Sequence, residues 1–376
     1  MSRHNDVRDM LTSKIDSYLL SFLKIQFSKF LLKARLLLGF IIYMHFISCS
    51  RIDPIIVISG ETWGTTYSIR IVDDSDVKID IESIQFRIDS IFLNIDKQMS
   101  TYKLDSEISL FNQMSLNESI NISKGFSEVI DRSIYWSELT SKAFDISVLP
   151  LVLLWRKGID RDTYNNTWEP PIDKDIINEM SKIGYNKINL EGQTLIKMIE
   201  GQMLDVNAIA KGWGVDQVFE FLITKGLSRF MVEIGGEVRV LGANNKGSEW
   251  KIGIDRPIEN NQPGKDIIAV VSLKNKAMAT SGNYRNFFQF NEKKYSHIID
   301  PRNGKSTQSN ISSVSVIGPN CMDADVLSTA LSILSLEEGK TLIASLDGFE
   351  AYWIIKDLEG NFKIESSNNM PVVSEL

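Results

Sequence analysis

The sequence predicts an α+β fold, and three observations support that prediction. Segments rich in β-branched and aromatic residues, which favour strands, alternate with segments whose apolar residues recur at helical spacing. The pair Gly235-Gly236 joins two apolar segments, as a tight β-hairpin requires. The 376 residues are 43% apolar and 24% charged, which provides a buried core and excludes a mainly disordered protein. With only two cysteines, the chain is not a disulfide-stapled scaffold.

The first half of the chain after residue 50 is expected to begin as strand and then become mainly helical. Strand is predicted where β-branched and aromatic side chains dominate, and helix where apolar side chains recur on one face. In order, the expected elements are strand at 55–72, helix at 77–99, a loop at 100–112, helix at 124–141, a polar connection at 157–173, and short strands near 186–190, 194–199 and 202–206.

The second half is expected to begin with a helix over 208–225 that ends at Gly226. Two strands joined by the Gly235-Gly236 turn follow, because paired glycines supply the positive φ of a tight hairpin. The remaining expected elements are strands at 250–254, 267–273 and 313–317, helices at 320–334 and 336–346, and a closing strand at 350–355.

The N-terminal segment has the composition of a secretory signal. Residues 1–35 contain seven Lys or Arg and three Asp, and an uncharged apolar run from Leu36 to Ser48 leads to Cys49. Phe46-Ile47-Ser48-Cys49 resembles a bacterial lipobox, in which the cysteine is lipidated. We therefore expect a targeting segment at 1–48 and a functional domain at 49–376, lipid-anchored to a membrane in the cell envelope and facing the periplasm. The alternative is an uncleaved N-terminal anchor, which also places the domain outside the cytoplasm.

The charge of the chain argues against nucleic acid as a partner. The net charge is -7 overall, and it becomes -11 when residues 1–35 are set aside. A dedicated nucleic-acid binder normally carries a positive surface.

The scarcity of histidine restricts the kinds of site that the chain can form. His297 is the only histidine after residue 50, so a zinc site built from several histidines is excluded. The sequence also lacks a P-loop and the glycine-rich fingerprint of dinucleotide-binding folds. A metal would therefore be hard and bound by oxygen atoms.

The helix expected at 320–334 offers such oxygen atoms. Asp325 and Thr329 are four residues apart, which places a carboxylate and a hydroxyl on one helical face. That pair suits Mg²⁺, which takes one or two carboxylates together with substrate oxygens. The alternative is a solvated Asp and a Thr bonded to its own backbone. Asp323 has a simpler explanation, because with Asn320 it can cap the helix.

Two further clusters contain candidate binding residues. Asp205 precedes a helix and can cap it, while Lys211 lies in the early turns of that helix, where a cation suggests an anionic partner. A turn-forming segment at 279–287 is followed by His297, which can act as a general base or bind a phosphate. The alternative for His297 is a structural role beside the turn at Asp300.

Taken together and in order, these motifs resemble the ApbE family of FAD:protein FMN transferases over about residues 55–355. The stretches that carry the resemblance are Gly64–Ile69, Met99–Tyr102, Asp105–Ile108, Ala143–Asp145, Pro150–Val152, Leu204–Gly212, Glu233–Glu237, Thr280–Gly282, Tyr284–Asn286, Ser296–Pro301, Ala324-Asp325 and Thr329-Ala330.

The resemblance implies a T-fold-like α+β topology with two merged lobes forming one globular unit. It also implies that FMN is transferred from FAD to a Thr or Ser hydroxyl of a target protein, with Mg²⁺ as cofactor and AMP as the second product. Side chains of Asp325 and Thr329 and the carbonyl of Ala208 are the implied Mg²⁺ ligands, and Asp325 and His297 are expected to carry the catalysis. The residues implied to contact the flavin nucleotide are Ala143, Phe144, Asp145, Asp205, Lys211, Ile299 and Trp63, the last standing where the family usually has Met.

The expected acceptors are subunits of membrane electron-transfer complexes. Two alternatives stay open at this point. One is a metal-dependent FAD pyrophosphatase that releases FMN and AMP, and the other is a flavin-binding lipoprotein without turnover. The metal pair Asp325 and Thr329 argues against the second, because holding FAD alone does not require it.

Overall fold

The computed structural model divides the chain into two units, Met1–Ile52 and Asp53–Leu376. It describes residues 21, 24, 26–31, 33, 35, 52–73, 79–158, 168–259, 261–283, 287–291, 293–357 and 359–376. In the first unit the described residues up to 35 are helical. The apolar run Leu36–Ser48 and Cys49 lie outside the described residues, so the targeting segment and its boundary stay predictions. Within the described part of the chain, no helix is both long and apolar enough to cross a membrane.

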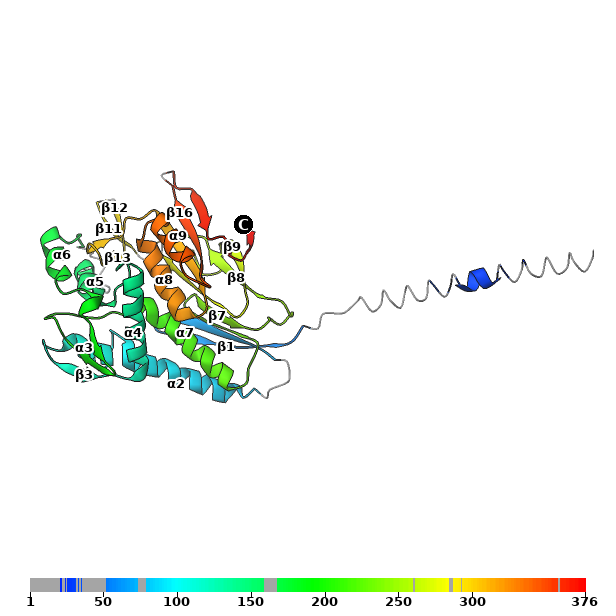
Figure 1. Cartoon of the computed structure of the whole chain (residues 1–376), viewed down its shortest axis with the longest axis horizontal. Coiled ribbons are helices and arrows are strands. Elements are labelled where there is room, and N and C mark those ends of the chain that lie inside the picture. The colour runs from blue at the N-terminus through cyan, green and yellow to red at the C-terminus, as the bar shows by residue number, and fades with distance from the viewer. Residues whose placement is uncertain are drawn as a thin grey trace, which may run out of the picture. The chain divides into compact units, whose positions relative to one another are not determined.

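The second unit combines helices, most of which lie before residue 225, with strands, most of which follow residue 229 (Figure 1). The helices are α2 (Ile81–Met99), α3 (Glu107–Gln113), α4 (Lys124–Leu139), α5 (Leu149–Arg156), α6 (Asp173–Met180), α7 (Asn207–Thr224), α8 (Cys321–Ile333) and α9 (Leu336–Ala344), with short 3₁₀ turns η1 (Ile146–Val148) and η2 (Tyr185–Lys187).

The strands belong to one large sheet and several small ones. They are β1 (Ile55–Thr62), β2 (Thr65–Val72), β3 (Ser119–Asn121), β4 (Asn189–Glu191), β5 (Thr194–Ile196), β6 (Phe230–Ile234), β7 (Glu237–Leu241), β8 (Trp250–Asp255), β9 (Ile267–Leu273), β10 (Ala277–Gly282), β11 (Phe287–Phe290), β12 (Lys293–Ser296), β13 (Ile299–Asp300), β14 (Lys305–Ser306), β15 (Ile311–Gly318), β16 (Glu350–Lys356), β17 (Phe362–Ser366) and β18 (Val372–Glu375).

The central feature is an eight-stranded sheet in the order β1-β2-β6-β7-β10-β15-β16-β17, in which neighbouring strands are antiparallel. Helices α7 and α8 cross one face of this sheet (Figure 1). Alternate side chains of β2 and β6, among them Ile69 and Val232, pack on α2 and α7. Val314 of β15 and Trp353 of β16 belong to the core that α4 and α8 complete.

The opposite face of the large sheet is covered by a second, smaller sheet. Strands β18, β9 and β8 form this three-stranded antiparallel sheet. Its apolar side chains, including Trp250 and Val271, pack on Val238, Met278 and Tyr352 of the large sheet. The arrangement buries both faces of the central strands, which explains why β15 is buried along its whole length.

Short-range sequence signals determine where several elements turn or begin. The hairpin between β6 and β7 turns at Gly235 and Gly236, whose φ values are 63° and 102°, in the region that glycine adopts at low cost. Helix α8 begins at an Asn320 cap, whose side chain accepts the N–H of Asp323 at 2.8 Å, as the sequence predicts.

The structure confirms the predicted α+β class and changes several elements. The segment 202–206, expected as a strand, forms no ladder; the N–H of Leu204 is instead bonded to the side chain of Asn112 at 2.7 Å. The loop expected at 100–112 contains the start of α3, which an N-cap at Ser106 initiates. Strand β16 does not close the fold, because β17 and β18 follow it.

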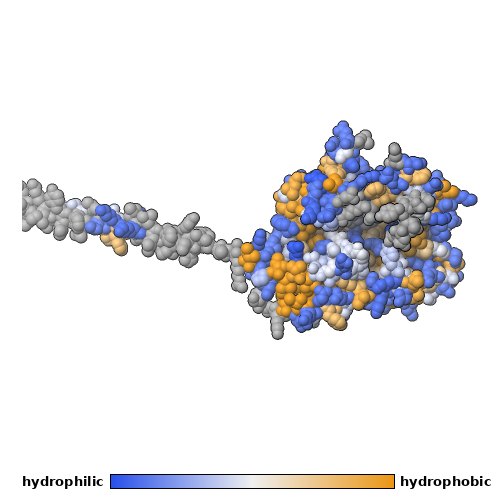
Figure 2. Space-filling view, turned by 180° about the vertical axis from the view of Figure 1, so that it is seen from behind, coloured by the Kyte–Doolittle hydropathy of each residue, from blue (hydrophilic) through white to orange (hydrophobic). Residues whose placement is uncertain are grey.

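The surface of the second unit mixes polar and apolar side chains. In the view of Figure 2, apolar side chains gather in separate groups between polar ones. Large apolar residues with high exposure include Phe86 on α2 and Leu104 before α3, which are 75% and 79% exposed.

Candidate active site

A cavity of about 600 Å³ opens among α7, α8, the β6–β7 turn and the segment before β13. Its size is within the range typical of sites for small molecules and cofactors. Of the residues that the sequence nominates, the ones that line it are Ala143, Phe144, Asp145, Asp205, Ala208, Lys211, His297, Ile299, Asp325 and Thr329. Residues more than 180 positions apart in the sequence therefore meet in one cavity.

Asp325 is positioned by the close approach of α7 and α8. One of its carboxylate oxygens, Oδ2, accepts the backbone N–H of Gly212 at 3.0 Å. Gly212 permits this contact because it has no side chain: a Cβ there would lie 2.4 Å from the carbonyl oxygen of Cys321 and 2.8 Å from the Asp325 Cβ. The Asp325 carboxylate is only 3% exposed, and its other oxygen, Oδ1, faces Lys211 at 3.6 Å.

Thr329 lies one helical turn after Asp325, so both side chains are on the cavity side of α8. The Thr329 hydroxyl is 3.0 Å from the Ser281 hydroxyl of β10, which also lies 2.8 Å from the Ser328 hydroxyl. The expected spacing thus produces a carboxylate and a hydroxyl on one wall, and the Thr329 hydroxyl is oriented by β10 in addition to its own helix.

Lys211 connects two buried carboxylates. Its ammonium donates to Glu237, the first residue of β7, and lies near Asp325. Burial lowers the pKa of Lys211, but Asp325 and Glu237 outweigh burial and raise that pKa above its ordinary value, so Lys211 carries a positive charge. Burial raises the pKa of Glu237 to about 7, against the opposing effect of Lys211. The sequence predicts no role for Glu237, because its contact with Lys211 depends on how β7 packs against α7.

The donor atoms at this wall fit a hard divalent cation. Ala208 departs from helical geometry, with φ −90° and ψ 15°, so its peptide plane is rotated and its carbonyl is tilted away from the helix axis. Glu237 Oε2 is buried and has no hydrogen-bond partner among the described residues, so no protein donor occupies this oxygen. Within the described part of the chain, no three His, Cys, Asp or Glu side chains group together as a metal site. A cation here would therefore be bound by hydroxyl and carbonyl oxygens beside Asp325, with water or substrate oxygens completing its coordination.

Asp145 determines the shape of the wall formed by Ala143 and Phe144. Its carboxylate accepts the N–H and hydroxyl of Ser147 at 2.8 and 2.6 Å, and the N–H of Tyr185 at 2.8 Å. Burial raises the pKa of Asp145, and these three bonds oppose that effect. Because its oxygens are occupied by protein donors, Asp145 orders the loop that faces the cavity.

Asp205 lies two residues before the start of α7 and lines the cavity. It accepts the N–H of Asn207, the first residue of α7, at 2.8 Å. Burial raises the pKa of Asp205, and nearby Arg156 opposes that effect. The N-cap position of α7 is Val206, and no side chain caps this helix, so the predicted N-cap role of Asp205 is wrong. Asp205 instead closes a local turn onto Asn207 and lies at the cavity.

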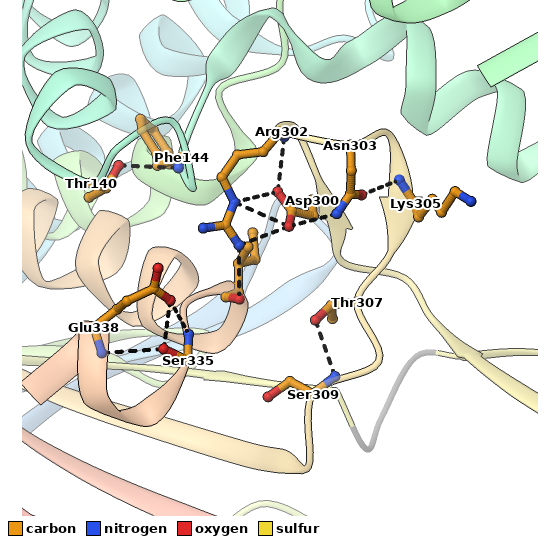
Figure 3. Close-up of polar contacts among 11 residues, drawn as sticks. Thr140, Phe144, Asp300, Arg302, Asn303, Lys305, Thr307, Ser309, Ser335 and Glu338 are labelled. Atoms are coloured by element: carbon orange, nitrogen blue, oxygen red, sulfur yellow. Dashed lines mark hydrogen bonds and ion pairs between the residues drawn. The ribbon is translucent and has the colours of Figure 1, made fainter. Parts of the chain in front are cut away.

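His297 and Ile299 lie on a segment whose C-terminal end is held by Asp300 and Arg302. Asp300 accepts three bonds from the backbone and guanidinium of Arg302 at 2.9 Å and a further one from the Asn303 amide at 3.1 Å (Figure 3). Arg302 also donates to the carbonyl of Ile333 at the end of α8, at 3.4 Å. The segment that carries His297 is thereby attached to the helix that carries Asp325 and Thr329.

Trp63 is the exception among the nominated residues that the structure describes. It occupies the β1–β2 turn with φ 51°, and its ring packs edge-on against Phe92 with centroids 5.1 Å apart. A Cβ on Gly214 of α7 would lie 2.5 Å from the Trp63 ring. Trp63 thus packs between α2 and α7 and does not line the cavity. The stretch Tyr284–Asn286 lies outside the described residues.

Comparison with known proteins places these features in a family. The model of the ApbE family matches residues 63–353. The FAD:protein FMN transferase of Haemophilus influenzae is 36% identical over 334 residues, which cover 87% of this chain and 94% of the relative.

Solved structures agree with that match. The flavin transferase ApbE from Vibrio cholerae is 34% identical, with a TM-score of 0.73 over 84% of this chain and 98% of that one. The flavinyl transferase ApbE of Pseudomonas stutzeri in its apo form is 30% identical, with a TM-score of 0.74 over 84% of this chain and 95% of that one. This chain is a member of the ApbE family.

Proposed function

We propose that this chain is an enzyme that transfers FMN from FAD to a Thr or Ser hydroxyl of a target protein and releases AMP. The names of its relatives and the nearly complete alignment with them support the reaction class. The observation that carries the proposal is the convergence of Lys211, Asp325 and Thr329 on one cavity. A half-buried ammonium and a cation-binding wall suit a pyrophosphate, whose charge must be neutralised before its phosphorus is attacked.

The reaction balances without an added oxidant or reductant. The acceptor hydroxyl oxygen forms a bond to the FMN phosphorus, the bond from that phosphorus to the bridging oxygen breaks, and AMP departs. The hydroxyl proton leaves with the solvent or through a protein base. Little covalent chemistry is required of the protein, so its task is to orient and stabilise charge.

Asp325, Thr329 and the Ala208 carbonyl are the groups that would hold Mg²⁺. When bound, that ion neutralises negative charge on the phosphate oxygens. Lys211 contributes a fixed positive charge at the same wall, and the buried loop of Ala143 and Phe144 excludes water from the opposite side.

His297 is proposed to accept the proton of the acceptor hydroxyl or to bind a phosphate oxygen. Its position on the cavity wall and its attachment through Asp300 and Arg302 support this role. His297→Ala should slow transfer at least tenfold. General acid–base groups typically contribute a factor of about 10²–10⁴ to the rate. An unchanged rate for His297→Ala would remove His297 from the reaction.

The proposed location is the periplasmic side of a membrane, with a lipid on Cys49. Membrane electron-transfer subunits that carry flavin on that side are the proposed acceptors. The basic segment, the apolar run and the lipobox-like residues before Cys49 support the location. Mass spectrometry of the N-terminal peptide should show a lipid-modified Cys49, and an intact N-terminus preceding Cys49 would contradict it.

One assay tests the proposed reaction against its alternatives. The full-length chain is incubated with FAD, Mg²⁺ and a candidate acceptor subunit, and the denatured acceptor is examined for flavin fluorescence. Fluorescence on the acceptor band supports transfer. Free FMN and AMP without labelling indicate a pyrophosphatase, and unchanged FAD indicates a binding protein without turnover.

A further inference from the structure

We propose that Glu237 is a positioning residue for cation binding: it retains the Lys211 ammonium so that Asp325 Oδ1 stays available to Mg²⁺. The inference rests on the proposed function, because it assigns a role to a residue around the proposed Mg²⁺ ligands. It adds a component that neither the spacing of Asp325 and Thr329 nor the family match assigns.

Lys211 lies between two carboxylates, and it is closer to Glu237 than to Asp325. Its ammonium is in direct contact with Glu237 Oε1, whereas its distance to Asp325 Oδ1 is 3.6 Å. The side chains of Glu237 and Asp325 are 4% and 3% exposed, so water screens neither carboxylate well. An ammonium at this position therefore belongs mainly to Glu237, although Asp325 is within reach.

One oxygen of Asp325 is already engaged by the backbone, and the other is not. Oδ2 is held by the N–H of Gly212 at 3.0 Å, which fixes the carboxylate relative to α7. Oδ1 is the oxygen that faces Lys211. Lys211 and a divalent cation would consequently compete for the same atom of Asp325.

The charges show what Glu237 changes in this competition. When both carboxylates are ionised, the two carboxylates and one ammonium carry a net charge of −1 and attract a cation. Without the Glu237 charge, Lys211 and Asp325 alone form a neutral ion pair, and a cation must displace the ammonium from its only remaining carboxylate. Oε2 of Glu237 has no hydrogen-bond partner among the described residues, so no protein donor competes with the ammonium for that oxygen.

The β6–β7 hairpin fixes the position of the Glu237 side chain. Glu237 is the first residue of β7 and is paired with Ile234 across the Gly235-Gly236 turn. A Cβ on Gly235 would lie 3.4 Å from Glu237 Oε2, so the carboxylate lies against the turn. The hairpin thus places the Glu237 carboxylate next to Lys211.

The test compares Mg²⁺ affinity between variants of the full-length chain by calorimetric titration with MgCl₂ and no FAD. Glu237→Gln should weaken Mg²⁺ binding by about 10- to 100-fold, the range for residues that orient metal ligands. Glu233→Gln is the matched control, because Glu233 lines the same cavity but its carboxylate accepts the N–H of Gly236 at 2.8 Å. That control should change Mg²⁺ affinity by no more than about threefold, below the effect of an orienting residue.

A double-mutant comparison separates an action through Lys211 from direct ligation. If Glu237 acts by retaining Lys211, adding Glu237→Gln to Lys211→Met should change Mg²⁺ affinity by less than about threefold, since the residue to be retained is gone. A full loss in the Lys211→Met background would make Glu237 a direct ligand and overturn the inference. Equal affinity of wild type and Glu237→Gln would overturn it as well.

A failure of the proposed function and a failure of the Glu237 inference would give different results in these titrations. A wild-type chain that binds no Mg²⁺ would overturn the proposed metal and this inference together, whereas wild-type binding with an unaffected Glu237→Gln overturns the inference alone. Transfer by Glu237→Gln should recover at high Mg²⁺, with a raised half-saturating concentration and a rate at saturation close to that of wild type. If Glu237→Gln does not fold, Glu237→Asp provides the same measurement, with a smaller loss of affinity because the charge is kept.

Discussion

Replacing Gly212 by Ala tests the helix contact that positions Asp325. The new Cβ would lie 2.4 Å from a backbone oxygen, that of Cys321, and 2.8 Å from the Asp325 Cβ. Such contacts require α7 and α8 to separate, because neither atom is the tip of a flexible side chain. Overpacking costs about 1–3 kcal/mol, and a clash with backbone places Gly212→Ala at the upper end, about 2–3 kcal/mol. The better helix propensity of Ala returns about 1 kcal/mol, which leaves a net loss of about 1–2 kcal/mol. At about 2–4 °C per kcal/mol, we expect Tm to fall by about 2–8 °C.

The same displacement should affect the proposed metal site, because Gly212 donates to Asp325 Oδ2. Thermal unfolding followed by circular dichroism measures the first effect, and the Mg²⁺ concentration for half-maximal transfer measures the second, which should rise at least tenfold. Gly339→Ala in α9 is the control, since its Cβ would meet the side chain of Leu331 at 3.1 Å. That side chain can shift, so the cost should stay below about 1 kcal/mol. An unchanged Tm and Mg²⁺ requirement for Gly212→Ala would refute the reasoning.

Three further predictions concern separate parts of the molecule. Thr329→Val keeps the β-branched shape but removes the hydroxyl, so the Mg²⁺ concentration for half-maximal transfer should rise about tenfold or more. An unchanged Mg²⁺ requirement would show that this hydroxyl is not a ligand. Arg132→Met removes a guanidinium bonded to the buried Asp323 at 2.6 and 2.7 Å. The free energy of unfolding measured in urea should fall by about 2–3 kcal/mol, less than for a fully buried pair because Arg132 is 34% exposed. A fall of less than about 1 kcal/mol would contradict a stabilising role for this ion pair. Burial raises the pKa of Asp216 to about 6, against the opposing effect of Arg239. The folded state therefore binds the Asp216 proton more tightly than the unfolded state does. The contribution of Asp216 to stability is largest below about pH 4 and declines as the pH rises through 6. Asp216→Asn should remove that decline in urea unfolding measured from pH 4 to 7, and an identical pH slope would contradict the assignment.

Much of the fold follows from local signals in the sequence. The Gly235-Gly236 hairpin and the helix capped by Asn320 have chemistry confined to a few neighbouring residues, and both are confirmed. Helix α3 was missed because it is only seven residues long and its start depends on the Ser106 cap. The segment 202–206 has strand-like residues, but a distant side chain, that of Asn112, takes one of its backbone groups. Propensity alone does not reveal such long-range partners.

The candidate site could be predicted to a similar degree. Helical periodicity was enough to place Asp325 and Thr329 on one face, and the structure brings both to the cavity. The roles of Glu237 and Gly212 depend on the packing of α7 against β7 and α8, which no local pattern encodes. Trp63 was nominated by its place in a motif, whereas its environment is set by contacts with α2 and α7.

The most direct test of the proposed function is the intact mass of an acceptor subunit after incubation with the full-length chain, FAD and Mg²⁺. The account predicts one added FMN less one water on a Thr or Ser, released AMP in equal amount, and no modification with Asp325→Asn. An unmodified acceptor together with free FMN and AMP, or with intact FAD, would contradict it.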